Sequence, residues 1–129
     1  MTIVIGSMIF AVLMIVMTKL PVALAMAKSN GGYDNKYPRD QQAQLEGFGK
    51  RALGAHVNAI EAFPLFAAGV LVALWAQAPI ETVTNLCMTF VAARCAYTIC
   101  YWFNFDSVRS LVWTVGFASS IWLMCLALP

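Results

Sequence analysis

Four long apolar stretches, separated by short polar segments, limit what this chain can fold into. No charged residue occurs in 2–18, in 62–80 or in 110–129. A helix needs about 20 predominantly apolar residues to cross the hydrocarbon core of a bilayer. The sequence therefore predicts an all-α integral membrane four-helix bundle with transmembrane helices at about 2–27, 47–78, 80–104 and 108–128.

The composition supports a membrane protein and argues against other classes. The chain has 129 residues, of which 61% are hydrophobic and 11% are charged, whereas a soluble domain has about 25% charged residues. At this length we expect a single domain over 1–129. The net charge of +2 is small and the basic residues form no stripe that could follow phosphates, so no nucleic-acid partner is expected.

The cysteines point to packing rather than to metal binding. All four lie in apolar segments, no two of them form a CxxC pair, and the chain has a single histidine. A Cys/His zinc set needs several such ligands at short spacings. We therefore expect no metal site and buried, thiol-bearing hydrophobic side chains at Cys87, Cys95, Cys100 and Cys125.

The first apolar stretch contains one charge, Lys19, and one proline, Pro21. We expect Lys19 to snorkel to the interface or to face the bundle, and the helix can kink at Pro21. The alternative is a cleaved signal peptide, because Ala23-Leu24-Ala25 resembles a small-residue cleavage site. No positively charged segment precedes the apolar run, which favours a retained transmembrane helix.

The connections differ in charge, and this difference predicts the orientation. The long polar segment 29–50 and its edges carry most of the basic residues, and Arg109 follows the third span. Basic loops stay in the cytoplasm, so we expect loops one and three to be cytoplasmic and both termini outside. Short loops without a targeting signal fit a bacterial inner membrane, although an organelle membrane remains open.

The second span begins with a polar face. On a helix, Asn58 lies about 20° from Arg51 around the axis and Glu61 about 60° from it, while His56 points about 140° away. Charged groups inside a bilayer need partners or a wet cavity. We therefore expect the side chains on this face to meet polar groups from other helices, and we expect His56 to pack against a helix or at the interface.

The third span repeats this pattern. Arg94, Tyr97 and Tyr101 are spaced three and four residues apart and share one face, and Arg109 lies just beyond the same end. One interpretation is a buried ion pair between Arg94 and Glu61 that joins the two helices. The other is a cytoplasm-facing cavity for an anionic ligand, because three arginines converge there with one glutamate.

These residues resemble the MAPEG family, which includes microsomal glutathione transferases, leukotriene C4 synthase, microsomal prostaglandin E synthase and the five-lipoxygenase-activating protein. The resemblance covers the whole chain by its length, four-helix layout and loop charge. It rests on two motifs in the same order as in the family: Arg51-x-x-x-Ala55-His56-x-Asn58-x-x-Glu61-x-x-Pro64, and then Arg94-x-x-Tyr97-x-x-x-Tyr101 with Arg109-Ser110.

The resemblance implies a homotrimer in the lipid bilayer, with active sites between protomers that are open to the cytoplasm and to lipid. It implies glutathione as the second substrate beside a lipophilic small molecule, with Arg109 as the catalytic residue that stabilises the thiolate. The residues expected to bind the tripeptide are Arg51, Asn58, Glu61, Arg94, Tyr97, Tyr101 and Ser110.

The chain departs from the family pattern at Gly54, where glutathione-using members commonly have an arginine. A missing arginine removes charge-assisted hydrogen bonds of about 1.5–3 kcal/mol each. Two functions therefore stay open. The chain is either a glutathione-dependent transferase or peroxidase, or a non-catalytic protein that binds lipids or partners through Trp102, Phe103 and Trp113. A purely structural role is the third alternative.

Overall fold

The computed structural model describes residues 1–129 and contains four long helices and one short one. They are α1 (Thr2–Lys28), α2 (Pro38–Ala43), α3 (Gly47–Trp75), α4 (Ile80–Trp102) and α5 (Asp106–Cys125). All four long helices are apolar and long enough to cross a membrane. The predicted four-helix membrane bundle is therefore confirmed.

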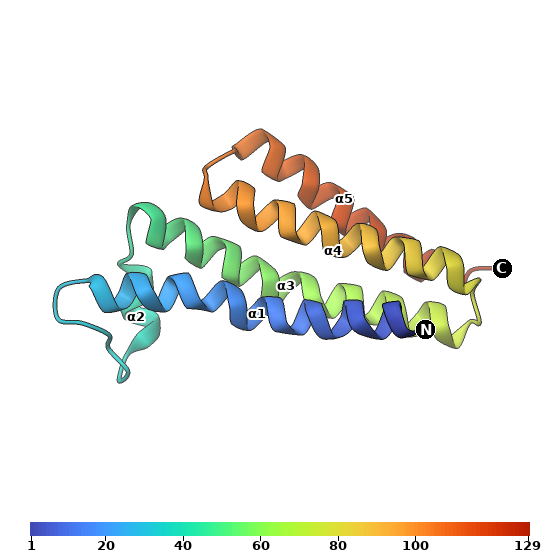
Figure 1. The fold of residues 1–129 in the computed structure, drawn as a ribbon, viewed down its shortest axis with the longest axis horizontal. Coiled ribbons are helices and arrows are strands. Elements are labelled where there is room, and N and C mark those ends of the chain that lie inside the picture. The colour runs from blue at the N-terminus through green and yellow to red at the C-terminus, as the bar shows by residue number, and fades with distance from the viewer.

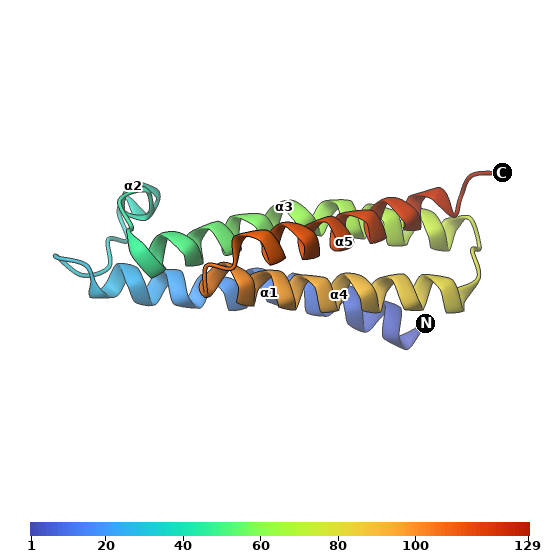
Figure 2. The ribbon, with the colours of Figure 1, turned by 90° about the horizontal axis from the view of Figure 1, so that it is seen from above.

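The helices run up and down, so that the two polar connections lie at the same end. Figure 1 shows the α1–α3 connection and the α4–α5 turn at one end, here named the loop end, and both termini with the α3–α4 connection at the other. The view from above in Figure 2 shows the same alternation. Helices α3 and α4 each pack against all the other long helices, whereas α1 and α5 do not contact each other.

The helix boundaries differ from the prediction mainly at the C-terminal ends. Helix α3 ends at Trp75 rather than near residue 78, and α4 ends at Trp102 rather than 104. Each is closed by a non-glycine residue in the left-handed region, Gln77 with φ 54° and Asn104 with φ 63°. The following residue donates its N–H back across the turn, from Ala78 to the Ala73 carbonyl at 3.0 Å and from Phe105 to the Cys100 carbonyl at 2.9 Å. Both ends are Schellman motifs.

Replacing Gln77 by glycine is expected to stabilise the protein by about 0.5–1 kcal/mol. The left-handed conformation costs an L-residue about 1–2 kcal/mol, and glycine avoids this cost. Part of the resulting stabilisation is lost, because glycine has greater conformational freedom in the unfolded chain. Thermal unfolding in detergent measures the change. Asn104→Gly is the matched comparison and should gain less, because asparagine adopts this conformation readily. A less stable Gln77→Gly variant would contradict this explanation of the α3 terminus.

The start of α5 was predicted incorrectly. The helix was predicted to begin near residue 108, but it begins at Asp106 and its N-cap is Phe105, with no side-chain cap. The Schellman motif of α4 already uses Asn104 and Phe105, so no spacer is left before α5. The Asp106 carboxylate instead accepts the Ser107 N–H at 2.6 Å in the first turn, where a negative charge is favourable.

Much of the apolar surface faces outward, as lipid contact requires. Only 29 of the 129 residues are buried, and large apolar side chains are exposed on every long helix. Inside the bundle, Phe66 of α3 and Phe90 of α4 stack at a centroid distance of 3.9 Å. Gly69 brings α3 against the backbone of α5 at Ser120. Small residues at such contacts are typical of helix packing in membranes.

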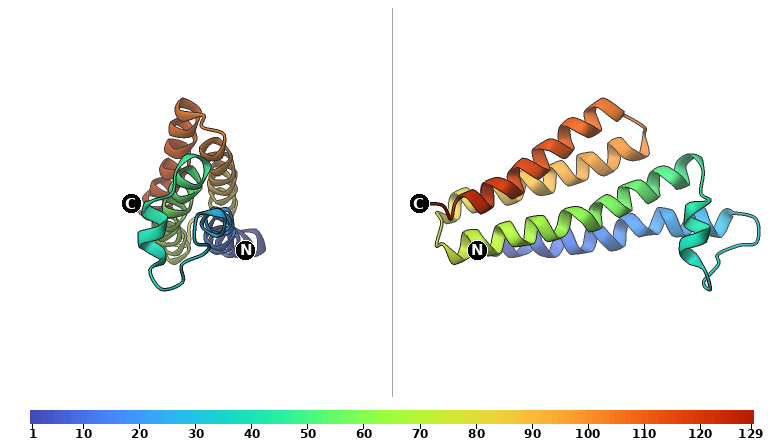
Figure 3. Two further views of the ribbon diagram at one scale, coloured as in Figure 1. Left: turned by 90° about the vertical axis from the view of Figure 1, so that its left-hand side faces the viewer. Right: turned by 180° about the vertical axis from the view of Figure 1, so that it is seen from behind.

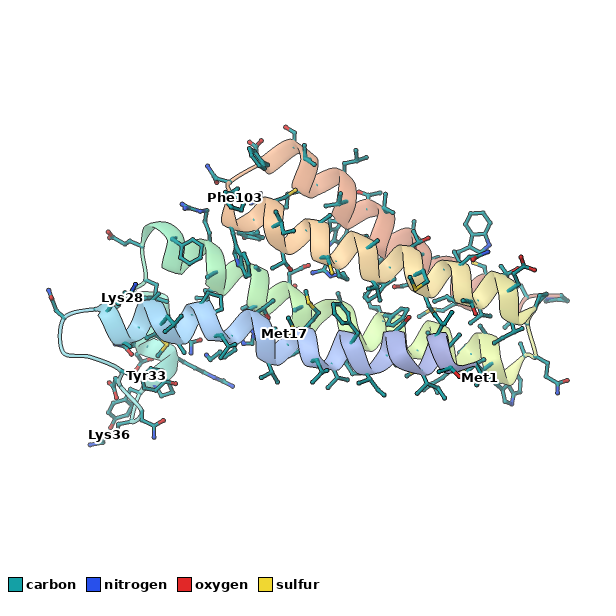
Figure 4. All side chains as sticks on the ribbon, viewed as in Figure 1. Met1, Met17, Lys28, Tyr33, Lys36 and Phe103 are labelled. Carbon is teal, nitrogen blue, oxygen red and sulfur yellow. The ribbon has the colours of Figure 1, made fainter.

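A compact polar loop covers the loop end beside α1 and α3. The short helix α2 lies outside the four long helices, as the end-on view in Figure 3 shows. Its Gln41 side chain donates to the Gly32 carbonyl at 2.7 Å and accepts the Asp34 N–H at 2.9 Å. Figure 4 places Lys28, Tyr33 and Lys36 at this end, away from Met1. The basic loop is therefore folded onto the end of the bundle.

Candidate functional site

The polar faces of α3 and α4 meet through Asn58. The guanidinium of Arg94 donates from Nη2 to Asn58 Oδ1 at 2.7 Å. Asn58 Nδ2 in turn donates to Glu61 Oε2 at 3.3 Å, because the two residues are three positions apart and share one face of α3. The predicted meeting of these faces therefore takes the form of an arginine–amide–carboxylate chain.

Arg94 is buried without a direct countercharge. Its side chain is 6% exposed, and it forms no salt bridge within 4.0 Å. The ion pair with Glu61 that the sequence allowed is not formed, because the Asn58 amide lies between the two charges. An uncompensated buried charge is expensive. The guanidinium has five N–H groups. One on Nη2 donates to Asn58, and the side chain forms no other hydrogen bond.

Two tyrosines connect Arg94 with Arg109. The Arg94 guanidinium lies over the Tyr97 ring at 4.4 Å, and the Arg109 guanidinium lies over the Tyr101 ring at 4.4 Å. The two rings meet edge to face, with a centroid distance of 5.6 Å and an interplanar angle of 71°. We name the connected set of residues the polar cluster, and its members are Asn58, Glu61, Arg94, Tyr97, Tyr101 and Arg109.

The residues of the polar cluster extend from the bundle interior to its surface. Tyr97 is 7% exposed and belongs to the buried core, whereas Glu61 is exposed. Arg109 is half-buried in the first turn of α5. The cluster therefore has a deep positive group at Arg94, a shallow positive group at Arg109 and one accessible carboxylate. Such a set can hold a ligand that carries more than one negative charge and one positive charge.

Two predicted site residues make other contacts. Arg51 donates from Nε to the Trp102 carbonyl at 3.1 Å, so it satisfies a free carbonyl at the end of α4. Ser110 is exposed, and its hydroxyl donates to the Asp106 carbonyl of its own helix at 3.1 Å. Neither side chain forms a hydrogen bond with the polar cluster, and their assignment to ligand binding stays a prediction.

His56 lies on the opposite side of α3 from the polar cluster. It is buried, with its Nδ1 3.2 Å from the Thr18 hydroxyl of α1. The prediction that His56 packs against another helix is therefore confirmed. Lys19 is half-buried and lies with Arg39 and His56 along an outer groove between α1 and α3.

A cavity of about 100 Å³ opens beside the polar cluster, between α3, α4 and α5. One wall is polar and is made by Asn58, Glu61 and Arg94. The other wall is apolar, and its large side chains are Leu65, Phe90, Trp113 and Phe117. Trp113 and Phe117 stack with a centroid distance of 5.2 Å. Phe90 and Phe117 were not predicted as site residues, although the spacing of Trp113 and Phe117 by four residues places both on one face of α5.

These features define a class: an integral membrane four-helix protein with a polar, arginine-rich site that extends from the middle of the bundle toward its loop end, next to a cavity with apolar lining. The MAPEG family model matches residues 3–129, which is essentially the whole chain. The chain belongs to the MAPEG family, a family of membrane proteins that includes glutathione transferases and related enzymes. No curated protein and no solved structure matches the chain.

Proposed function

We propose that this protein is a glutathione-dependent transferase or peroxidase that acts on lipophilic electrophiles dissolved in the membrane. The observation that carries the proposal is the buried Arg94, which is bonded to Asn58 and has no carboxylate partner within the chain. An anionic ligand would supply the countercharge that this guanidinium lacks. The family membership makes glutathione the first candidate for that ligand.

The residues of the polar cluster fit the chemistry of glutathione. The tripeptide carries two carboxylates, one ammonium group and a thiol. Arg94 and Arg109 are suited to the negative groups, since guanidinium groups bind carboxylates with charge-assisted hydrogen bonds. Glu61 is the one acidic residue of the cluster and is exposed, so it is suited to the ammonium group. Tyrosine hydroxyls supply further donors and acceptors.

Arg109 is the residue to which we assign thiol activation. A free thiol has a pKa of about 8.5, and a nearby guanidinium lowers this pKa and so raises the thiolate fraction at neutral pH. In a transferase reaction, the thiolate sulfur forms a bond to an electrophilic carbon and the leaving group departs with its electron pair. In a peroxidase reaction, two glutathione thiols are oxidised to a disulfide while a hydroperoxide is reduced to an alcohol and water.

The apolar wall of the cavity is suited to the lipophilic partner. Leu65, Trp113 and Phe117 line the same cavity as Asn58, Glu61 and Arg94. Trp113 is 40% exposed and Phe117 is 41% exposed on the outer surface of the bundle, where hydrocarbon chains would lie. A molecule dissolved in the bilayer can thus approach the thiol without crossing water.

The orientation of the protein in the membrane is part of the same proposal. The loop end carries the basic loop between α1 and α3, and the positive-inside rule assigns such loops to the cytoplasm. Cytoplasmic glutathione would then reach the polar cluster directly. We expect the protein to lie in a bacterial inner membrane and to form a homotrimer, as in other members of the family. The termini lie at the opposite end (Figure 1), on the outer side in this orientation.

A non-catalytic lipid-binding protein is the second candidate. A specific observation favours it: one outer face of α5 is wholly apolar and is formed by Phe117, Ala118, Ile121, Trp122 and Cys125. A lipid chain could lie along this face without any chemistry at the polar cluster. The experiment below separates this candidate from the enzyme.

The test uses the purified protein in detergent, with glutathione and a chromogenic electrophile. We expect glutathione to raise the unfolding temperature, because a ligand that binds only the folded state stabilises it, and we expect turnover above the uncatalysed rate. Inorganic phosphate serves as the control for a general anion effect. A shift without turnover would mean that the polar cluster binds glutathione but does not activate it, and would contradict the proposed enzyme. If millimolar glutathione causes neither a shift nor turnover, the proposed function is contradicted and the lipid-binding protein is favoured.

A further inference from the structure

Gly54 of α3 lies against the hydroxyl end of the Tyr101 side chain of α4. A Cβ atom placed on Gly54 would lie 2.8 Å from Tyr101 Cε1 and would overlap with Cζ and the hydroxyl oxygen. Real Cβ atoms do not approach other atoms this closely. Any side chain at position 54 would therefore have to displace the Tyr101 ring. The absence of a side chain at Gly54 is what allows the ring to pack against the α3 backbone.

The position of Tyr101 matters because Arg109 depends on it. The Arg109 guanidinium lies 4.4 Å from the centre of the Tyr101 ring, and its side chain forms neither a hydrogen bond nor a salt bridge within the chain. The Tyr101 ring also packs edge to face with the Tyr97 ring. A ring pushed away from α3 would therefore take away the surface on which Arg109 rests.

We propose that Gly54 is a positioning residue that sets the place of the Arg109 guanidinium through the Tyr101 ring. This inference rests on the proposed function of Arg109 in thiol activation. It also offers a reason for the glycine at position 54, where glutathione-using members of the family commonly have an arginine. The volume next to residue 54 is filled by Tyr101, so an arginine at position 54 and Tyr101 in its present place exclude each other.

The inference requires that an added methyl group act on Arg109 and not only on stability. In Gly54→Ala, we expect the pH midpoint of glutathione thiolate formation to rise and kcat to fall about tenfold or more. Gly6→Ala is the matched control, since a Cβ at Gly6 meets no atom within 4 Å, and it should leave both quantities unchanged. A variant with a lower unfolding temperature but an unchanged pH midpoint would overturn the inference.

A readout without glutathione keeps this inference separable from the proposed function. The Nε–H resonance of Arg109 in detergent, assigned by its loss in Arg109→Lys, should feel the ring current of Tyr101. We expect Gly54→Ala to shift this resonance and Gly6→Ala to leave it in place. If wild type binds no glutathione but the shift occurs, the proposed function fails and the positioning role stands. An unchanged resonance overturns the positioning role.

A second variant covers the case in which Gly54→Ala does not fold. Tyr101→Leu keeps Gly54 and removes the aromatic ring, so it tests the link between ring and guanidinium alone. We expect the Arg109 resonance to move and the thiolate midpoint to rise as in Gly54→Ala. In the Tyr101→Leu background, adding Gly54→Ala should have little further effect on either quantity. An Arg109 resonance that stays in place in Tyr101→Leu overturns the inference.

Discussion

Arg109→Ala is expected to lower kcat/KM for glutathione on the order of 100-fold while the bundle stays folded. Removing one preorganised group that stabilises a developing anion typically costs 10²–10³-fold in rate. The guanidinium is half-buried and rests on the Tyr101 ring, so its charge is less screened than at an open surface. The ultraviolet absorbance of bound thiolate and the steady-state turnover rate measure the effect.

Two further variants test whether the loss of activity is specific to the Arg109 guanidinium. Arg39→Ala removes the same charge from an exposed position on α2 and should leave turnover within about twofold of wild type. Arg109→Lys keeps the charge but loses the planar group that stacks on the ring, so we expect an intermediate rate. If Arg109→Ala were as active as wild type, thiol activation could not be assigned to Arg109, even if the protein proved to be an enzyme.

Gly69→Ala is expected to lower the free energy of unfolding by about 1–3 kcal/mol. A Cβ at Gly69 would lie 2.7 Å from the Ser120 carbonyl oxygen and 3.0 Å from Leu123 Cβ. The first of these atoms belongs to the backbone and cannot rotate away. Helices α3 and α5 would have to separate, which would loosen the contacts of the buried Leu123 side chain.

Thermal unfolding in detergent checks this expectation against two matched variants. Gly116→Ala adds the same methyl group where the nearest atom lies 3.5 Å away, and Gly6→Ala adds it where no atom lies within 4 Å. Both should change the free energy of unfolding by no more than about 0.5 kcal/mol. A Gly69→Ala variant as stable as these two would mean that the close approach of α3 to α5 contributes little to the bundle.

The fold could be predicted from the sequence because the bilayer restricts the alternatives. A backbone in hydrocarbon must satisfy its own hydrogen bonds, so long apolar stretches have to be helices. The helix ends were harder to predict. Gln77 and Asn104 close α3 and α4 in the left-handed conformation, and the sequence around Gln77 has no glycine that would signal it. The preceding helix end in turn determined where α5 begins.

The candidate site could be predicted where helical spacing alone decides it. Asn58 and Glu61 share a face of α3, and Arg94 and Tyr97 share a face of α4, so two faces that meet bring these residues together. Arg51 shares the face of Asn58 but lies two turns closer to the loop, about 10 Å along the axis. At that level it meets the end of α4 at Trp102 and not Arg94.

The apolar wall of the cavity and the Gly54 contact could not be predicted in this way. In a membrane helix, an apolar residue that lines a cavity looks the same as one that faces lipid, because both environments are apolar. Spacing placed Phe117 on the same face of α5 as Trp113, but nothing distinguished Phe90 or Phe117 as a residue that lines a cavity. The contact of Gly54 with Tyr101 depends on how closely α3 and α4 approach each other, and spacing along one helix does not fix that distance.

Calorimetric titration of glutathione into the purified protein tests most directly whether the polar cluster binds this ligand. We expect saturable binding to wild type. In Arg94→Gln, which keeps a polar side chain but loses the charge, we expect at least tenfold weaker binding, since a charge-assisted hydrogen bond contributes about 1.5–3 kcal/mol. No saturable binding to wild type, or equal affinity in Arg94→Gln, would contradict the assignment of this site to glutathione.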